Sequence, residues 1–286
     1  MIVIETHIVP TQKIPIRIQE YLVEVFKTIP TKSGIKKAIK KELIFVDGSA
    51  TTTAKMIVGG EEITLYQSEE NKSLKRLNLK LEVLFEDDYL AIINKPAGIL
   101  VSGNKFKTIA NGIAQNLKPS LQIDTCKPKP VHRLDYPTTG LLLIGKTKSA
   151  ILFLNKLFEN KEIQKEYIAV TIGKMNPLGI IEIPVDEKES VSHFEVLKTV
   201  NSKRFEFLNL VKLTPKTGRR HQLRKHLSAI GNPILGDKEY GFENLILNGK
   251  GLYLHAARLN FLHPITKEEM DINKEVPNKF RKIFSE

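Results

Sequence analysis

Asp135 is an acidic residue in a segment whose composition predicts a fixed turn. Pro137, two threonines and Gly140 follow it, and residues 141–144 are all aliphatic. Turns favour proline, threonine and glycine, and a short aliphatic run is typical of a buried strand. The turn would therefore hold the carboxylate in place against a rigid support. Arg133, two positions earlier, has a guanidinium that can bind phosphate or pair with a carboxylate.

A second concentration of polar side chains follows Gly218. Residues 219–227 are rich in Arg, His, Gln and Lys, and a helix is expected to run from here to residue 230. Leu223, Leu227 and Ile230 would form its buried stripe. A different face would carry Arg220, His221, Arg224 and Ser228. That face can bind a carboxylate or an RNA phosphate, but a solvated basic helix would show the same pattern.

Residues 165–172 are expected to form a strand, because Ile168, Val170 and Ile172 stand at every second position. Ile168 and Val170 would lie on one face. Lys165 and Tyr167 would then share the other, which places an amine and an aromatic ring on the same side of the sheet.

Two other kinds of chemistry are disfavoured. Residues 140–147 match the P-loop pattern of nucleotide-binding proteins. However, their four central residues are strand-forming aliphatics, at positions where phosphate would have to reach the backbone.

A metal site is disfavoured as well. His221 and His226 are five positions apart, whereas a spacing of four would place two metal ligands on one helix face. Cys126 has no partner cysteine. We therefore expect neither a nucleotide nor a metal cofactor.

The N-terminal segment predicts a small module of two helices and a sheet. Apolar residues at helical spacing indicate a helix over residues 14–26, and Ser33 is the expected N-cap of a second helix over residues 34–41. The apolar run 43–46, followed by Asp47-Gly48, indicates a hairpin.

The second of these helices would be amphipathic, with Ile35, Ala38 and Ile39 on one face and lysines on the other. A lysine face can bind a phosphate backbone through counterion release without reading bases, although many such faces are only solvated. The candidate RNA-binding residues are Lys32, Lys36, Lys37, Lys40 and Lys41.

A polar stretch without periodicity indicates a linker over residues 68–79. It separates an N-terminal domain, residues 1–67, from a second domain, residues 80–286. In the second domain strands dominate and hairpins outnumber crossovers, so we expect an α+β fold with a mixed, largely antiparallel sheet. Residues 126–130, rich in proline and lysine, are expected to form a loop.

The charge of the chain limits its partners. It has 44 Lys and Arg residues against 32 Asp and Glu, a formal net charge of +12, and an excess of this size favours nucleic acid. The single cysteine excludes an internal disulfide and suggests a reducing compartment. No segment approaches the roughly twenty apolar residues of a membrane span. We expect a cytoplasmic monomer without membrane contact.

Several motifs resemble, in order and spacing, those of RluA-type RNA pseudouridine synthases. They are His132-Arg133-Leu134-Asp135 with Thr138-Thr139-Gly140, then Lys165-Glu166-Tyr167, then Gly218-Arg219-Arg220-His221-Gln222-Leu223-Arg224, with Asn94-Lys95-Pro96-Ala97-Gly98 and Leu254-His255-Ala256 as flanking signatures. Motifs in register are far more specific than any one of them. The N-terminal module resembles the alpha-L RNA-binding domain of ribosomal proteins, with Arg17-Ile18-Gln19 where that family usually has Arg-Leu-Asp.

The resemblance implies that uridine within an RNA chain is isomerised to pseudouridine, without cofactor or metal. The N1–C1′ bond is broken, C5 is joined to C1′, and the target base must leave its stack. By resemblance, Asp135 is the essential carboxylate, which either attacks the sugar or assists glycosidic cleavage. Arg224 would pair with Asp135, Tyr167 would lie against the uracil ring, and Arg133 would fill the gap left by the flipped nucleotide. Lys165 is a candidate for charge pairing near the site.

The RNA target stays open at this point. Members of the family act on large-subunit ribosomal RNA, on transfer RNA, or on both, and the N-terminal module favours ribosomal RNA. The alternative from a different class is a non-catalytic RNA-binding or ribosome-assembly protein. A replaced Asp135 or Tyr167 would indicate that alternative, and both residues are present.

Overall fold

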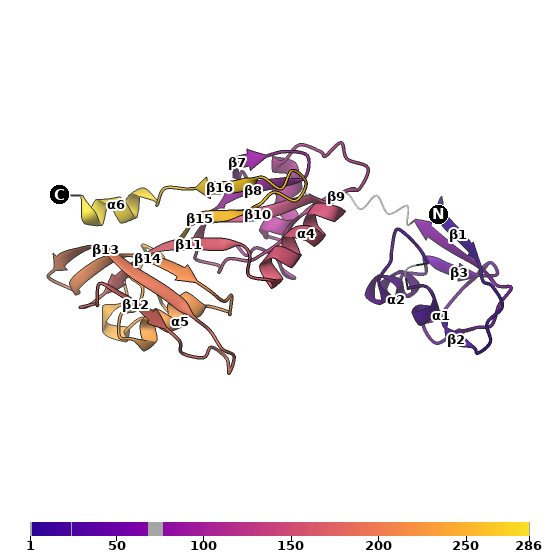
Figure 1. Ribbon diagram of the computed structural model, residues 1–286, viewed down its shortest axis with the longest axis horizontal. Helices are drawn as coiled ribbons and strands as arrows, with labels where there is room; N and C mark the ends of the chain where they lie inside the picture. Colours follow the sequence, from indigo (N-terminus) through magenta and orange to yellow (C-terminus); the bar gives the residue numbers. More distant parts are fainter. Residues whose placement is uncertain (1, 24, 68–76, 286) are drawn as a thin grey trace. The chain divides into compact units, whose positions relative to one another are not determined.

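The computed structural model describes residues 2–23, 25–67 and 77–285, and the chain folds as two compact units, Met1–Lys75 and Arg76–Glu286 (Figure 1). Most of the expected linker, residues 68–76, lies outside the described residues. Within the described part of the chain, no helix combines the length and the hydropathy that crossing a membrane requires.

The N-terminal unit contains a four-stranded sheet in the order β1-β6-β3-β4. These strands are β1 Ile2–Ile8, β6 Glu62–Gln67, β3 Ile44–Val46 and β4 Ser49–Ala50. Asp47 and Gly48 have φ angles of 49° and 75°, and two residues with positive φ form the turn that suits a tight hairpin. The predicted hairpin is therefore confirmed, whereas β1 was not predicted.

The helix expected over residues 14–26 is wrong over most of its length. Strand β2, Ile16–Arg17, pairs with β5, Met56–Ile57. Among the described residues of this range, only α1, Ile18–Tyr21, is helical. Pro15 disfavours the helical conformation of the residue before it and has no amide hydrogen to donate. The chain therefore begins this segment in an extended conformation. Ile18, Leu22 and Phe26 still reach the core of the unit, which explains the misleading periodicity.

Helix α2, Lys32–Lys40, begins earlier than expected. Its N-cap is Thr31, whose extended backbone lets the hydroxyl accept the amide of Gly34 at 3.2 Å. Ser33, the expected N-cap, lies inside the helix. The amphipathic pattern is confirmed, because Ile35, Ala38 and Ile39 are buried in the core. The lysines named as candidates are exposed: Lys32, Lys36, Lys37, Lys40 and Lys41.

The second unit is built on one large sheet of ten strands among the described residues. Its strands are β7 Glu82–Glu86, β8 Leu90–Lys95, β9 Thr125–Pro130, β10 Thr139–Thr147, β11 Gln164–Ile172, β12 Leu178–Ile181, β13 Ser192–Ser202, β14 Glu206–Pro215, β15 Leu254–Leu262 and β16 Glu269–Asn273. Helical segments are α3 Ile109–Gly112, η1 Ile113–Asn116, α4 Lys148–Glu159, α5 Gln222–Ala229, η2 Glu243–Leu245 and α6 Asn278–Phe284.

The main path of the sheet runs β12-β13-β14-β11-β15-β10-β8-β7, with β16 beside β15 and β9 beside β10. The pair β10–β15 is parallel, and the other strand pairs of this sheet in the described residues are antiparallel. This confirms the expected α+β fold with a mixed, largely antiparallel sheet.

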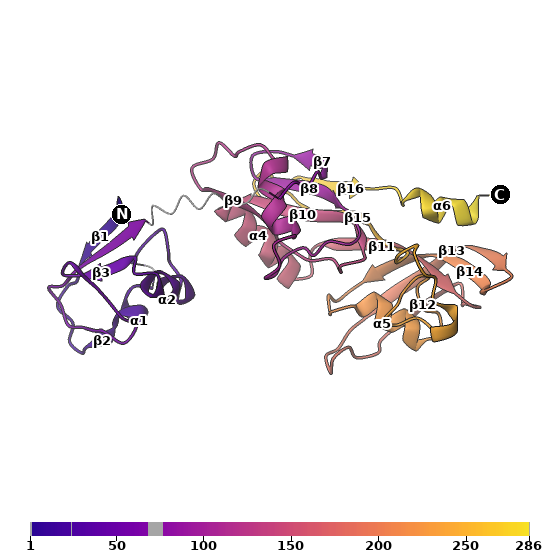
Figure 2. The same cartoon turned by 180° about the vertical axis from the view of Figure 1, so that it is seen from behind.

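Strands β8 and β10 lie side by side at the centre of one half of the sheet, as the view in Figure 2 also shows. Alternate residues of their apolar runs enter two different cores. Leu142 and Ile144 pack in the core that includes α3 and η1, while Leu141 and Leu143 pack in the core that includes α4. Burial on both faces explains why the run is continuously aliphatic rather than alternating. It gives the turn of Asp135 a rigid support.

The expected loop over residues 126–130 is wrong, since β9 pairs antiparallel with β10. Proline cannot donate to a strand ladder and is therefore confined to edge strands. Pro128 and Pro130 are tolerated because β9 pairs with β10 alone among the described strands.

The segment that matches the P-loop pattern is strand β10 itself. The Nζ of Lys146 is buried and lies 2.7 Å from Glu86 Oε1, so this amine is already used inside the protein. Gly140 has φ of 112°, and a Cβ there would overlap the carbonyl of Ala256 on β15. The glycine therefore allows close packing of two strands and does not form a phosphate loop.

Candidate active site

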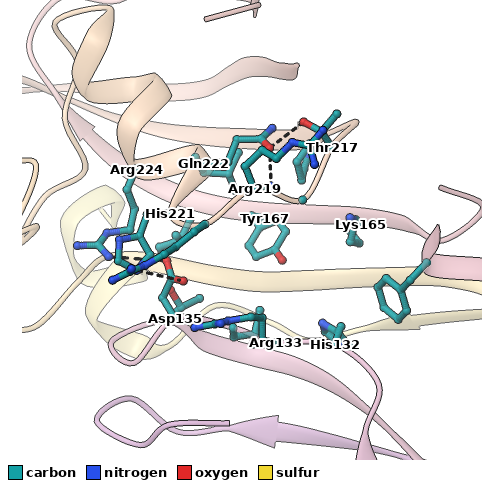
Figure 3. Close-up of a pocket in the computed structure, with 18 of the residues that line it drawn as sticks. His132, Arg133, Asp135, Lys165, Tyr167, Thr217, Arg219, His221, Gln222 and Arg224 are labelled. Atoms are coloured by element: carbon teal, nitrogen blue, oxygen red, sulfur yellow. Dashed lines mark hydrogen bonds and ion pairs between the residues drawn. The ribbon is translucent and has the colours of Figure 1, made fainter. Parts of the chain in front are cut away.

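A cavity of about 460 Å³ opens in the second unit where the turn of Asp135, strand β11 and the start of α5 meet (Figure 3). Its lining includes four predicted substrate-binding residues, Arg133, Lys165, Tyr167 and Arg224, together with Asp135. Residues that are far apart in the sequence thus share one site. The lysines of α2 belong to the N-terminal unit.

The carboxylate of Asp135 lies between two basic side chains. Its Oδ1 is 3.7 Å from Nε2 of His221, and its Oδ2 is 3.7 Å from Nη1 of Arg224. Both separations are longer than a hydrogen bond, which is common in active sites without substrate because such contacts tighten when substrate binds. The side chain of Asp135 is 17% exposed, so the carboxylate is sheltered but accessible from the cavity.

Arg224 is held mainly by Asp237 rather than by Asp135. Its Nε and Nη2 donate to the two carboxylate oxygens of Asp237 at 2.7 and 2.8 Å, and Nη2 also donates to Glu239 at 3.1 Å. Burial disfavours the charged guanidinium, but the hydrogen bonds and charge of Asp237, with the charge of Asp135, outweigh it and raise the pKa of Arg224. The remaining nitrogen, Nη1, is thereby fixed toward Asp135.

His221, which was expected on the same face as Arg224, is a second neighbour of Asp135. It precedes α5 with φ of 55° and ψ of 22°, a left-handed conformation that costs a non-glycine residue about 1–3 kcal/mol. Its Nδ1 lies 2.9 Å from the hydroxyl of Tyr240. The contact of Nδ1 with Tyr240 therefore fixes the imidazole ring, and Nε2 faces the carboxylate of Asp135.

The helix expected directly after Gly218 begins only at Gln222. The intervening turn is fixed by the Gln222 side chain, whose Oε1 accepts from Thr217 Oγ1 at 2.7 Å and from the amide of Arg219 at 3.0 Å. Its Nε2 donates to the Val191 carbonyl at 3.0 Å. Propensity alone cannot reveal these long-range contacts, which place His221 at the cavity.

Lys95 stabilises the turn that carries Asp135 by hydrogen bonds to its backbone. Its fully buried amine donates to the carbonyl oxygens of Pro96, Tyr136 and Thr138 at 3.0, 3.3 and 2.8 Å. Burial, partly offset by the charge of Asp135, lowers the pKa of Lys95 to about 8. The amine thus ties both sides of the Asp135 turn to the end of β8.

Tyr167 lies near the centre of the cavity, with Asp135 and Arg224 on one side and Lys165 on the other (Figure 3). Burial, with the charge of Asp135, raises the pKa of its phenol. The hydroxyl therefore keeps its proton at neutral pH, and the ring is available as an apolar surface. The predicted placement of Lys165 and Tyr167 on one side of β11 is borne out by their shared cavity.

His132 and Lys165 lie at the far end of the cavity (Figure 3), and Phe158 also lines it. The ring of His132 stacks on Phe158 at 4.8 Å between centroids, and its Nε2 accepts the amide of Leu143 at 3.0 Å. Burial, with the charge of Lys165, lowers the pKa of His132 to about 3. His132 is thus neutral and structural, whereas Arg133 beside it is exposed at the cavity.

Sequence reasoning named Asp135 and Arg224 but not the side chains that hold them. Lys95 was visible as part of a flanking signature, and His221 as part of the third motif. Asp237 and Tyr240 carry no recognisable spacing, since they follow α5 in an irregular segment. They become recognisable only when that segment folds back on the helix.

Comparison with known proteins shows that the chain is similar to RNA pseudouridine synthases. The family model for RNA pseudouridylate synthase matches residues 89–229. An uncharacterized RNA pseudouridine synthase of Bacillus subtilis is 32% identical, with 93% of this chain and 94% of the relative covered. Ribosomal large subunit pseudouridine synthase D of Vibrio cholerae is 29% identical, with 92% and 88% covered. The solved structure of human RNA pseudouridylate synthase domain containing 4 is 26% identical, with a TM-score of 0.58 over 70% of this chain and 90% of that one.

The mixed sheet and the similarity over nearly the whole chain define the class of protein as an RNA-modifying isomerase. The chain belongs to the RluA-type RNA pseudouridine synthase family, whose reaction converts uridine in RNA to pseudouridine. The resemblance seen in the motifs is thereby confirmed.

Proposed function

We propose that this protein isomerises uridines of large-subunit ribosomal RNA to pseudouridine, with Asp135 as the catalytic carboxylate and without a cofactor. The observation that carries the proposal is the position of Asp135, on a turn tied down by Lys95 and between the basic groups of His221 and Arg224. A carboxylate there is accessible from the cavity and lies close to the fixed guanidinium of Arg224.

The other cavity residues suit a flipped uridine. Tyr167 offers an aromatic face, and stacking on such a face contributes roughly 1–3 kcal/mol per base. Arg133, exposed at the cavity, is the residue we assign to the gap that the nucleotide leaves in the RNA. Lys165, half-buried beside Tyr167 and close to the ring of Phe158, would bind a phosphate of the substrate.

Ribosomal RNA is supported by the relatives. Several of them, including the Vibrio cholerae protein, are named as ribosomal large subunit pseudouridine synthase D. The exposed lysines of α2 would add a sequence-independent contact with the RNA backbone, which makes the N-terminal unit an RNA-binding domain. We further assign the protein to the cytoplasm as a monomer, in keeping with its single cysteine and its RNA substrate.

Release of tritium from RNA labelled at uridine C5 tests the proposal, because C5 loses its hydrogen when it bonds to C1′. Wild-type protein should release tritium from a large-subunit ribosomal RNA transcript, and Asp135→Asn should release none. Release from transfer RNA alone would show that the substrate is transfer RNA rather than ribosomal RNA, while the proposed reaction would stand. Equal release by Asp135→Asn and wild type would remove Asp135 from the mechanism, and the absence of release by wild type from either RNA would favour a non-catalytic RNA-binding protein.

A further inference from the structure

His221 lies in the wall between two cavities. The cavity of Asp135, about 460 Å³, and a second one of about 510 Å³ are both lined by His221 and Arg224. Asp135 lines the first and Glu239 lines the second. Arg224 cannot exchange protons at neutral pH, because its pKa is raised above an already high value. His221 is therefore the shared side chain that can take up and release a proton.

The two ring nitrogens of His221 face different partners. Nε2 lies 3.7 Å from Oδ1 of Asp135. Nδ1 lies 2.9 Å from the hydroxyl of Tyr240 and 3.4 Å from Oε1 of Glu239. The carboxylate of Glu239 is 49% exposed, so the series of groups that starts at Asp135 ends at solvent.

The protonation of Tyr240 sets the direction of this series. Burial, with the hydrogen bond to Glu239 and its charge, raises the pKa of Tyr240 to about 12. The phenol therefore keeps its proton and can donate it to Glu239, which leaves the phenol oxygen to accept from Nδ1–H of His221. In that tautomer Nε2 carries a lone pair toward Asp135 and is ready to receive a proton.

The backbone fixes the ring in this place. His221 has a left-handed conformation between Arg220 and the first turn of α5, and such strain persists only where the surroundings over-determine it. The side chain is only 11% exposed. A solvated histidine at a helix start would need neither the strain nor the burial.

We propose that His221 removes from Asp135 the proton that uracil C5 loses in the last step, and passes it to solvent through Tyr240 and Glu239. This rests on the proposed function. Once C5 is bonded to C1′, it carries both the sugar and its original hydrogen. The C5–H bond then breaks, its electron pair forms the C5=C6 bond as the N1=C6 bond opens, and N1 takes a proton from water.

The lost proton goes first to Oδ1 of Asp135, which is a free carboxylate again at this stage. It passes to Nε2 of His221, while Nδ1 gives up its proton to the Tyr240 oxygen and the phenol proton moves to Glu239 and on to water. One proton leaves C5 and one arrives at N1, so charge and atoms balance. His221 acts here through Asp135 and makes no bond to the substrate.

The substitution His221→Asn suits the test because asparagine tolerates the left-handed conformation but cannot relay a proton. On a large-subunit ribosomal RNA transcript we expect turnover to fall roughly 100-fold, as for loss of a general acid–base group. With deuterium at uridine C5, the isotope effect on turnover should rise above that of wild type, because C5 deprotonation becomes rate-limiting. Tyr240→Phe, which removes only the hydroxyl, should raise the isotope effect in the same direction.

A transcript with 5-fluorouridine separates proton removal from orientation of Asp135. Fluorine cannot leave C5 as a cation, so only glycosidic cleavage and rejoining are observed, as loss of 5-fluorouridine from RNA digests. We expect His221→Asn to consume 5-fluorouridine at the wild-type rate. A parallel fall on both transcripts, or an unchanged isotope effect in both variants, would overturn the proposal and leave His221 as a residue that orients Asp135.

Thermal unfolding identifies a variant that fails to fold, and in that case Tyr240→Phe alone decides between the two outcomes. Failure of the proposed function would look different, since wild-type protein would then consume neither uridine nor 5-fluorouridine.

Discussion

Asp237 holds Arg224 by two hydrogen bonds, of 2.7 and 2.8 Å, that engage both oxygens of one carboxylate and two nitrogens of the guanidinium. Both side chains are almost completely buried. This two-point contact leaves a third nitrogen, Nη1, 3.7 Å from Asp135. The orientation of the arginine at the active site is thus set by a carboxylate that makes no contact with the cavity of Asp135.

Asp237→Asn should therefore harm both stability and activity. Removing one partner of a buried ion pair leaves the other charge unpaired, so we expect the free energy of unfolding to fall by about 3 kcal/mol. Turnover should fall as well, because Nη1 loses its fixed direction. Urea unfolding and tritium release measure the two effects.

Glu239→Gln is the matched control for stability, since Glu239 contacts the same guanidinium but is 49% exposed. We expect a change below about 1 kcal/mol. Equal losses of stability in the two variants would show that Asp237 has no special role in holding Arg224.

Tyr167→Leu should lower kcat/KM on ribosomal RNA by roughly 5- to 150-fold, the kinetic equivalent of one stacking interaction. Tyr167→Phe keeps the ring and should retain most of the activity, because burial and the charge of Asp135 raise the phenol pKa and keep its proton out of the reaction at neutral pH. Steady-state kinetics with both variants checks this. A loss in Tyr167→Phe as large as in Tyr167→Leu would assign the function to the hydroxyl instead.

Lys95→Met should reveal a pH dependence of stability. At pH 7 the variant leaves three buried carbonyls without their donor, which we expect to cost about 2–4 kcal/mol. The pKa of Lys95 is lowered from 10.5 to about 8 in the folded protein, so between these pH values the unfolded chain binds more protons. Wild-type stability should consequently rise relative to the variant above pH 8, by about 2 kcal/mol at pH 10.

Urea unfolding of both proteins at intervals from pH 7 to pH 10 measures this difference. Other groups titrate equally in the two proteins and cancel. A difference that stays constant over the whole range would mean that Lys95 has an ordinary pKa and is not desolvated as its buried position indicates.

The double substitution Lys36→Ala and Lys40→Ala tests the lysine face of α2. These residues are one helical turn apart and exposed, so the fold should be unaffected. The slope of log affinity against log salt for ribosomal RNA should decrease by about 1–2, as expected for two lost phosphate contacts. Lys13→Ala with Lys55→Ala changes the charge of the same unit equally, at exposed positions outside α2, and should leave the slope closer to that of wild type.

Local patterns determined much of the fold. The apolar residues at every second position from Ile168 to Ile172 lie in β11, as the side-chain period of a strand predicts. The aliphatic run after Gly140 lies in β10, where burial on both faces favours a continuous apolar run. The local patterns gave wrong predictions where pairing with a strand distant in the sequence determined the structure. Residues 16–17 joined β5, and residues 125–130 joined β10, which no local propensity could show.

For the site, the sequence by itself determined the turn of Asp135, the family resemblance of its motifs, and a basic group near Arg224. Only the tertiary structure decided what holds these groups. Asp237 and Tyr240 fold back against α5, Lys95 reaches the turn of Asp135 from β8, and His221 reaches Asp135 from a strained position before α5. Hydrogen bonds between residues distant in the chain depend on geometry in three dimensions, and residue type and spacing do not encode that geometry locally.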